Sequence, residues 1–276
     1  MGVAEALVRR LRAAGCVFAE EEAALILEQA AAVGGGQAEV DRLAAARASG
    51  LPLEQVLGWA GLAGIRVAVE PGVFVPRRRT ELMVAEAVAR GLARSTEHGP
   101  VVLLDLCCGS GAVGAAVANR LRTAGIAVDV TAADLDPVAV RCARGNLPGA
   151  RVVQGDLFDA VPGGLRGRVD LLTANVPYVP TAALALMPRE AREHEPRATL
   201  DGGTDGLDVL RRVARAAPTW LAPGGTLLVE TSERQQPTAL AVLEQAGLEA
   251  TVRTDDDLGA VVVLGTRAEV RVRPRR

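Results

Sequence analysis

Short apolar runs that alternate with helical segments are the feature of this sequence that most limits its fold. The apolar runs lie at residues 101–106, 126–134, 150–156, 169–175, 225–231 and 259–265. The segments with helical periodicity lie near residues 80–94, 112–124, 136–146, 205–217 and 234–247. Strands that alternate with helices form a mostly parallel sheet covered on both faces, with ligands bound at the carboxyl ends of the strands. The pattern predicts an α/β fold from about residue 76 onward.

The N-terminal part of the chain has a different pattern. Residues 3–57 are rich in Ala, Leu, Glu and Arg, and their apolar positions recur at helical spacing, which predicts three or four short helices. Residues 62–75 alternate as strands do, and Glu70-Pro71-Gly72 predicts that a β-hairpin turns there. We therefore predict a helical domain over residues 1–58, a hairpin linker over 59–76 and a sheet domain over 77–276.

Charge and apolar content exclude several classes of protein. Apolar residues make up 49% of the 276 residues, enough for a sizeable core, and no apolar run is long enough to cross a membrane. The formal net charge of −2 provides no field to gather nucleic acid, and the basic run at 267–276 is expected to be a solvated end. A cytoplasmic protein without membrane attachment is expected, and nucleic acid is an unlikely partner.

The cysteines and the basic residues limit the chemistry further. Cys16, Cys107, Cys108 and Cys142 have neither zinc-site spacing nor the density of a disulfide framework, so free thiols and no metal are expected. Every basic residue of the Lys and Arg class is arginine, which excludes Schiff-base chemistry on lysine.

A glycine-rich turn follows the apolar run at 101–106. Gly109, Gly111 and Gly114 form G-x-G-x-x-G, with Asp134 further on, as in dinucleotide-binding proteins. However, Asp105 precedes the first glycine, where a carboxylate would repel a pyrophosphate. A cationic ligand fits better. S-adenosyl-L-methionine carries an ammonium and a sulfonium, and the Asp-x-x-x-Gly-x-Gly turn is similar to the usual signature of the methyltransferases that use it.

Acids at the ends of three successive apolar runs extend this predicted cofactor site. Asp134 is placed to accept hydrogen bonds from ribose hydroxyls, and Asp156 to accept one from an adenine amino group while Leu157 covers the ring. Solvated strand ends or helix caps are the alternative roles of these acids. The residues predicted to contact the cofactor are Asp105, Cys107, Cys108, Gly109, Ser110, Gly111, Asp134, Leu135, Asp156, Leu157 and Asn175.

The run at 169–175 continues into Asn-Val-Pro-Tyr, which contains the only tyrosine of the chain. The Asn175 side-chain carbonyl and the Val176 backbone carbonyl can each accept one N–H of a planar NH2 group and orient its nitrogen. Pro177 stiffens the turn, and the Tyr178 ring provides a flat apolar face. These residues are the predicted catalytic and acceptor-binding group, with an ordinary turn as the alternative.

At these residues the chain resembles the HemK-like family of protein glutamine N5-methyltransferases, whose members modify peptide chain release factors or a ribosomal protein. The resemblance extends over nearly the whole chain, including Pro-Arg-x-x-Thr-Glu from residue 76 and the segments at 195–213 and 221–235. It implies a class I methyltransferase fold with a Rossmann-like seven-stranded sheet, joined by the hairpin to a small helical domain for substrate recognition. It also implies substrate contacts from Arg77, Thr80 and Glu81, and Glu195 is a further candidate.

Three departures from the family pattern indicate a divergent branch. Val176 replaces the first proline of the usual Asn-Pro-Pro-Tyr, Cys107 stands where glycine is usual, and Arg78-Arg79 stands where proline and an acid or polar residue are common. The Val176 carbonyl is retained, so the departures bear on the substrate more than on the reaction.

The predicted function is transfer of a methyl group from S-adenosyl-L-methionine to the side-chain amide of a protein glutamine, leaving S-adenosyl-L-homocysteine. A peptide chain release factor or a ribosomal protein is the expected partner. The alternatives are an N6-adenine methyltransferase of DNA or RNA and a protein that binds the cofactor without turnover. A nicotinamide oxidoreductase is disfavoured because no proton-transfer pair stands near the strand ends.

Overall fold

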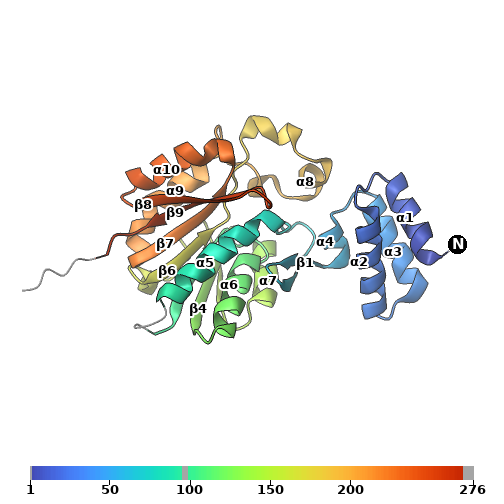
Figure 1. The fold of residues 1–276 in the computed structure, drawn as a ribbon, viewed down its shortest axis with the longest axis horizontal. Helices are drawn as coiled ribbons and strands as arrows, with labels where there is room; N and C mark the ends of the chain where they lie inside the picture. Colours follow the sequence, from blue (N-terminus) through green and yellow to red (C-terminus); the bar gives the residue numbers. More distant parts are fainter. Residues whose placement is uncertain (1, 95–98, 270–276) are drawn as a thin grey trace, which may run out of the picture.

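The structure is a computed structural model that describes residues 2–94 and 99–269 (Figure 1). A helical domain lies at one end of the molecule, and a layered α/β domain forms the rest. Most of the basic run expected to be a solvated end, residues 270–276, lies outside the described residues.

The helical domain has a core of its own. Its helices are α1 (Val3–Ala13), α2 (Ala19–Ala32), α3 (Gly36–Ala48) and α4 (Leu53–Leu57), as the helical spacing predicts. Leu11, Ile26 and Leu43 are fully buried where these helices meet. Because this core is distinct from those of the sheet domain, the helical part packs around its own apolar stripes.

The linker hairpin is shorter and earlier than predicted. Strands β1 (Trp59–Leu62) and β2 (Ile65–Ala68) pair antiparallel around Ala63 and Gly64. The prediction of a turn at Glu70-Pro71-Gly72 is therefore wrong for the hairpin. Ala63 and Gly64 both have positive φ, as a two-residue hairpin turn that matches the strand twist requires. Residues 70–73 form a separate turn outside the strands, in which the Val73 N–H donates to the Glu70 carbonyl.

A seven-stranded sheet forms the centre of the α/β domain, in the order β5-β4-β3-β6-β7-β9-β8. Its strands are β3 (Val101–Leu106), β4 (Val128–Asp134), β5 (Arg151–Gln154), β6 (Val169–Ala174), β7 (Leu221–Thr231), β8 (Glu249–Asp255) and β9 (Ala260–Thr266). All neighbouring pairs are parallel except those that involve β9, which runs antiparallel to β7 and β8. The order changes direction between β3 and β6, and α/β sheets bind ligands beside such a switch point.

Helices cover both faces of this sheet, as parallel strands require (Figure 1). Helices α5 (Glu81–Arg94), α6 (Ala112–Thr123) and α7 (Pro137–Asn146) cover one face together with the hairpin. Helices α9 (Asp208–Trp220) and α10 (Gln236–Gln245) cover the other. Helix α8 (Arg189–His194) lies in the connection between β6 and α9. The predicted fold class is confirmed.

None of the helices in the described residues is long and apolar enough to cross a membrane.

Candidate functional site

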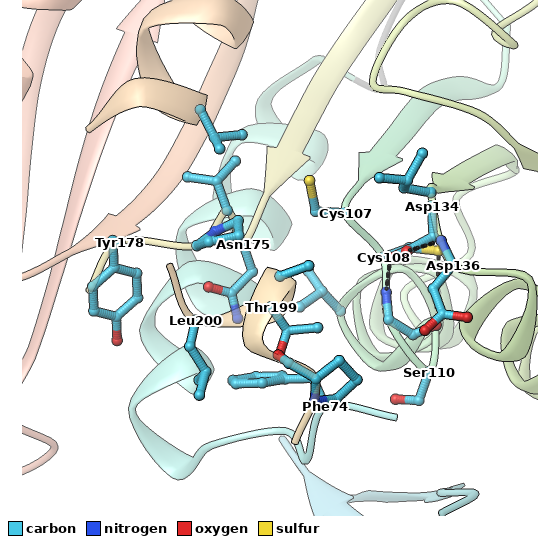
Figure 2. Close-up of a pocket in the computed structure, with 18 of the residues that line it drawn as sticks. Phe74, Cys107, Cys108, Ser110, Asp134, Asp136, Asn175, Tyr178, Thr199 and Leu200 are labelled. Atoms are coloured by element: carbon cyan, nitrogen blue, oxygen red, sulfur yellow. Dashed lines mark hydrogen bonds between the residues drawn. The ribbon is translucent and has the colours of Figure 1, made fainter. Parts of the chain in front are cut away.

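A pocket of about 400 Å³ opens at the carboxyl ends of β3, β4, β5 and β6 (Figure 2). Most residues that the sequence singles out line it, on both the predicted cofactor side and the predicted acceptor side. The lining includes Arg77, Thr80, Asp105, Cys107, Cys108, Gly109, Ser110, Asp134, Leu135, Asp156, Leu157, Asn175, Val176, Pro177 and Tyr178. Of the predicted residues, only Gly111, Glu81 and Glu195 are outside the lining, and the ligand contacts of the others stay predictions.

Asp105, the residue before the last of β3, is a buried carboxylate that lines the pocket. Its Oδ1 accepts a hydrogen bond from the Thr173 hydroxyl at 2.8 Å, and its Oδ2 accepts one from the Gly114 backbone N–H at 3.0 Å. A Cβ on Gly114 would lie only 3.0 Å from Oδ2, so glycine permits this close approach. Burial raises the pKa of Asp105 to about 7 despite these bonds. A cation next to it would stabilise its charged form.

The loop after β3 contains a residue in an unusual backbone conformation. Cys107 has a φ of +52°, in the left-handed region that favours glycine. Burial raises the pKa of the Cys107 thiol, so the thiol stays protonated at neutral pH. Gly111 starts α6 with a φ of +76°, and its missing side chain lets the loop pack against Leu147 and Ala143 of the α7 region. Gly111 therefore supports the loop from outside the pocket.

Asp134 fastens the same loop to the end of β4. Its Oδ2 accepts the Gly109 N–H at 2.8 Å, and its Oδ1 accepts the Asp136 N–H at 3.0 Å. Each oxygen keeps a lone pair for a further donor such as a hydroxyl. Asp136 also lines the pocket and caps α7 through Val138, a position that the cap pattern Asp-Pro marks in the sequence.

Asp156 and Leu157 follow β5 at the pocket edge. One oxygen of Asp156 accepts a hydrogen bond from Arg212 at 2.8 Å, so this carboxylate already has a cationic partner from α9. Leu157 has a φ of +51° and is buried. Positive φ in a bulky residue is uncommon and occurs preferentially at ligand sites.

The Asn-Val-Pro-Tyr turn lies next to the glycine-rich loop because β6 pairs with β3, with Ala174 opposite Leu106. Figure 2 shows Asn175 between Tyr178 on one side and Cys107 and Ser110 on the other. The Tyr178 hydroxyl donates to Glu230 at 2.9 Å, which holds the ring at the pocket wall. Sequence reasoning missed Glu230, which lies on the distant strand β7.

The segment before α5 supplies a second wall. Arg77 and Thr80 line the pocket, and Thr80 donates to Glu230 at 2.7 Å. Glu81 instead faces the hairpin turn, where its Oε1 accepts the Ala63 N–H at 3.4 Å. Glu195 is buried behind the wall and pairs with Arg77 at 2.6 Å. Burial raises the pKa of Glu195.

The irregular connection between β6 and α9 also lines the pocket. Met187, Thr199 and Leu200 of this connection line the cavity together with Phe74. Figure 2 shows Thr199, Leu200 and Phe74 around the side-chain amide of Asn175. These residues were not singled out in the sequence, because only the fold brings irregular segments over the strand ends.

The carboxylates of the pocket fit a ligand that carries positive charge and hydroxyl groups. Three carboxylates, Asp105, Asp134 and Asp156, lie at the ends of three adjacent parallel strands. Such a row disfavours a polyphosphate and favours an ammonium or sulfonium group. Among the described residues, no group of three or more His, Cys, Asp or Glu side chains could hold a metal ion.

Comparison with known proteins gives named relatives although no protein-family model matches the chain. The chain is 39% identical over 229 residues to a release factor glutamine methyltransferase of Geobacter sulfurreducens, covering 82% of this chain and 76% of the relative. It is 36% identical over 264 residues to the protein of the same name from Deinococcus radiodurans, covering 89% and 90%. It is also 38% identical over 200 residues to the 4-amino-L-phenylalanine/4-methylamino-L-phenylalanine methyltransferase of Streptomyces pristinaespiralis, covering 71% and 66%.

Solved structures support the fold. A T. thermophilus 16S rRNA N2 G1207 methyltransferase in complex with AdoMet and guanosine matches with a TM-score of 0.52 and 20% identity. The match covers 76% of this chain and 49% of that one. At this identity the similarity concerns the fold alone.

Proposed function

The chain belongs to the release factor glutamine methyltransferase family, and from this premise we propose that it methylates the side-chain amide of a glutamine in a peptide chain release factor. S-adenosyl-L-methionine is the cofactor, and the predicted membership of the HemK-like family is confirmed by the relatives. The proposal concerns which protein is modified and which residues carry the transfer.

One observation carries the assignment of roles. Asp105, near the carboxyl end of β3, and the turn with Asn175, directly after β6, belong to neighbouring strands and line the same pocket. A cofactor held against the β3 loop and an acceptor held by the β6 turn would therefore meet at the switch point of the sheet.

The acceptor side orients a planar NH2 group. When bound, S-adenosyl-L-methionine supplies a methyl group on a positively charged sulfur. The Asn175 side-chain carbonyl and the Val176 carbonyl accept the two N–H bonds of the amide and aim its nitrogen along the line of transfer. Tyr178 packs against the plane of the amide. Its hydroxyl is engaged by Glu230, and burial raises its pKa, so it has no acid–base task at neutral pH.

The test is transfer of labelled methyl groups to purified acceptors. The protein is incubated with methyl-labelled S-adenosyl-L-methionine and release factors, ribosomal proteins or nucleic acid, and the label is located by mass spectrometry. Label on a glutamine amide of a release factor is expected, and its loss when that glutamine is replaced by alanine is the control. Label on adenine, or cofactor binding without transfer to any acceptor, contradicts the proposal.

A second candidate acceptor is a small aromatic amine. The relative from Streptomyces pristinaespiralis is named for 4-amino-L-phenylalanine and its methylamino form, and its identity to this chain equals that of a Streptomyces coelicolor release factor glutamine methyltransferase, 38%. An aryl amine shares the flat NH2 geometry of a carboxamide, and Phe74 and Met187 add apolar surface to the same pocket. Incubation with 4-amino-L-phenylalanine tests this candidate, since N-methylation of the free amino acid would assign it.

A further inference from the structure

Glu230 is a buried carboxylate with three partners from two distant segments. Only 1% of its side chain is exposed. Its Oε1 accepts hydrogen bonds from the Tyr178 hydroxyl and from Arg79 Nε, both at 2.9 Å, and its Oε2 accepts one from Thr80 at 2.7 Å. It is absent from the pocket lining, so it reaches the pocket only through these partners. A buried carboxylate with this many donors defines their positions closely.

Gln235 fixes the other end of the same tyrosine. Its Nε2 donates to the Tyr178 backbone carbonyl and to the Asp205 carbonyl, both at 2.8 Å. Its Oε1 accepts hydrogen bonds from the hydroxyls of Thr231 and Ser232. The amide is buried and uses both its donor and its acceptor atoms, so it has one favourable orientation.

Together these contacts hold Tyr178 at its hydroxyl and at its carbonyl. The Arg79 guanidinium adds a third restraint, because it lies 5.6 Å from the centre of the Tyr178 ring. Both anchors come from the carboxyl end of β7 and the turn after it, whereas Tyr178 follows β6. The acceptor turn is therefore positioned by a strand that contributes no predicted catalytic residue.

We propose that Glu230 and Gln235 are positioning residues for methyl transfer, which act by fixing Tyr178 and with it the two carbonyls that orient the acceptor. This inference rests on the proposed function, since it concerns the same planar acceptor. Displacement of a reacting group by about 1 Å costs on the order of 100-fold in rate, so loss of an anchor should lower the rate of transfer.

The first test is the variant Glu230→Gln, which keeps the size of the side chain and removes its charge. We expect kcat to fall about 10- to 100-fold, because Arg79 and Tyr178 lose their common anionic acceptor. The affinity for S-adenosyl-L-methionine should change little, because the predicted cofactor residues, apart from Asn175, lie in or directly after β3, β4 and β5. Gln235→Met, which removes both donors at similar volume, should act in the same direction.

Asp170→Asn is a matched control. Asp170 is also a largely buried acid that accepts an arginine Nε, from Arg94 at 2.7 Å, and a second donor, the Val102 N–H at 2.9 Å. It lies near the start of β6, at the end of the strand opposite the pocket. This variant should lower stability without lowering kcat once the folded fraction is accounted for.

Two further measurements separate positioning from general damage. If Glu230 acts through the tyrosine hydroxyl, Tyr178→Phe combined with Glu230→Gln should lose little more than either change alone. Tyr178 is also the only tyrosine of the chain, so 3-fluorotyrosine gives a single fluorine resonance. This resonance should shift in Glu230→Gln, because the Tyr178 hydroxyl loses the carboxylate that accepts its hydrogen bond, and it should not shift in Asp170→Asn.

The outcomes are distinguishable from failure of the proposed function. Absence of transfer by the wild-type protein to every release factor rejects the proposed function. Wild-type transfer with equal losses in Glu230→Gln and Asp170→Asn rejects the positioning role alone. Losses that multiply in the double variant, or a fluorine resonance that does not shift in Glu230→Gln, also overturn it.

Discussion

At the scale of single residues, two side chains of the pocket differ in their chemistry. Asp105 is a buried acid whose ionised form is disfavoured until a cation lies beside it. Asn175 directs its amide into the cavity among Thr199, Leu200 and Phe74 (Figure 2). Under the proposed function, Asp105 would recognise the positive charge of the cofactor and Asn175 the flat NH2 group of the acceptor.

The pKa of Asp105 predicts that cofactor affinity depends on pH. The ammonium group of S-adenosyl-L-methionine prefers the ionised carboxylate, so affinity should fall as pH falls below about 7, by up to about tenfold per pH unit. Calorimetric titration between pH 5.5 and 8.5 measures this slope and the protons released on binding, and Asp105→Asn is the control that should flatten it.

Without ligand, the same group acts on stability in the opposite direction. Its folded-state pKa is raised above the ordinary value, so its contribution favours the folded protein at low pH and is lost as pH rises from about 4 to 7. The pH dependence of unfolding in Asp105→Asn, compared with the wild type, measures this contribution. A wild-type curve with no greater loss of stability over that interval would contradict the raised pKa.

Removal of the Asn175 amide should strongly slow methyl transfer. We expect Asn175→Ala to lower kcat about 100- to 1,000-fold, the usual cost of losing one fixed hydrogen-bond partner of the reacting group. Single-turnover transfer to the acceptor is the measurement. An Asn175→Ala variant that transfers methyl groups within threefold of the wild-type rate would remove Asn175 from the catalytic group.

At the scale of elements, the turn at residues 202–206 and the acceptor turn fit together without space for a side chain. Gly206 has a φ of +81°, and a Cβ on it would lie 2.2 Å from the Tyr178 carbonyl oxygen and 2.3 Å from Gln235 Nε2. The glycine therefore allows the connection to close directly over the backbone of the acceptor turn.

Gly206→Ala should accordingly lower both stability and activity. Gly247 is a matched control, since it has the same φ of +81° but no atom within 4 Å of an added Cβ. Gly247→Ala reports backbone strain alone, about 1 kcal/mol, whereas Gly206→Ala should cost about 1–3 kcal/mol more and reduce kcat. Denaturant unfolding and methyl transfer measure the two effects. Equal losses of stability and equal kcat values in the two variants would show that the close contact between Gly206 and Tyr178 affects neither stability nor activity.

Most elements could be predicted from the sequence, because buried parallel strands and amphipathic helices have strong periodic patterns. Strand β8 (Glu249–Asp255) was not among the predicted apolar runs, since this edge strand is exposed along much of its length. The hairpin turn at Ala63 was placed too late because a proline-glycine pair at 71–72 is a stronger turn pattern than Ala-Gly.

The candidate site was predictable where short motifs mark it and hidden where tertiary contacts make it. The glycine-rich loop and the Asn-Val-Pro-Tyr turn are contiguous in sequence, so their residues could be named in advance. Glu230 is separated from Thr80 by 150 positions, and only the sheet order brings them together. Likewise, nothing local indicates that Glu81 faces the hairpin instead of the pocket.

At the scale of the whole molecule, Arg47 joins the helical domain to the connection over the pocket. It pairs with Glu22 of α2 at 2.7 Å, with Glu190 of α8 at 3.2 Å, and donates to the Leu51 carbonyl. Only 11% of its side chain is exposed. A buried arginine with this many acceptors fixes the relative placement of the elements that it contacts.

Arg47→Ala should therefore destabilise the protein by about 3 kcal/mol, because Glu22 would be left buried without its partner. Arg12→Ala is the control, since the Arg12–Glu20 pair of the same domain is exposed and should contribute less than about 1 kcal/mol. Chemical denaturation of both variants measures the difference. Equal losses of unfolding free energy would show that the buried Arg47 network stabilises the protein no more than an exposed ion pair does.

The pocket is lined both by strand ends and by the irregular connection after β6, and this difference affects how substrate specificity can diverge between relatives. Under the proposed function, the strand ends carry the groups that would bind the methyl donor and the acceptor nitrogen, whereas the irregular connection with Met187, Thr199 and Leu200 would shape the space around the rest of the acceptor. Exchange of that connection between relatives should change which acceptor is bound, and it should leave the methyl-transfer reaction unchanged. A single scaffold can in this way serve both a macromolecular side chain and a free amino acid.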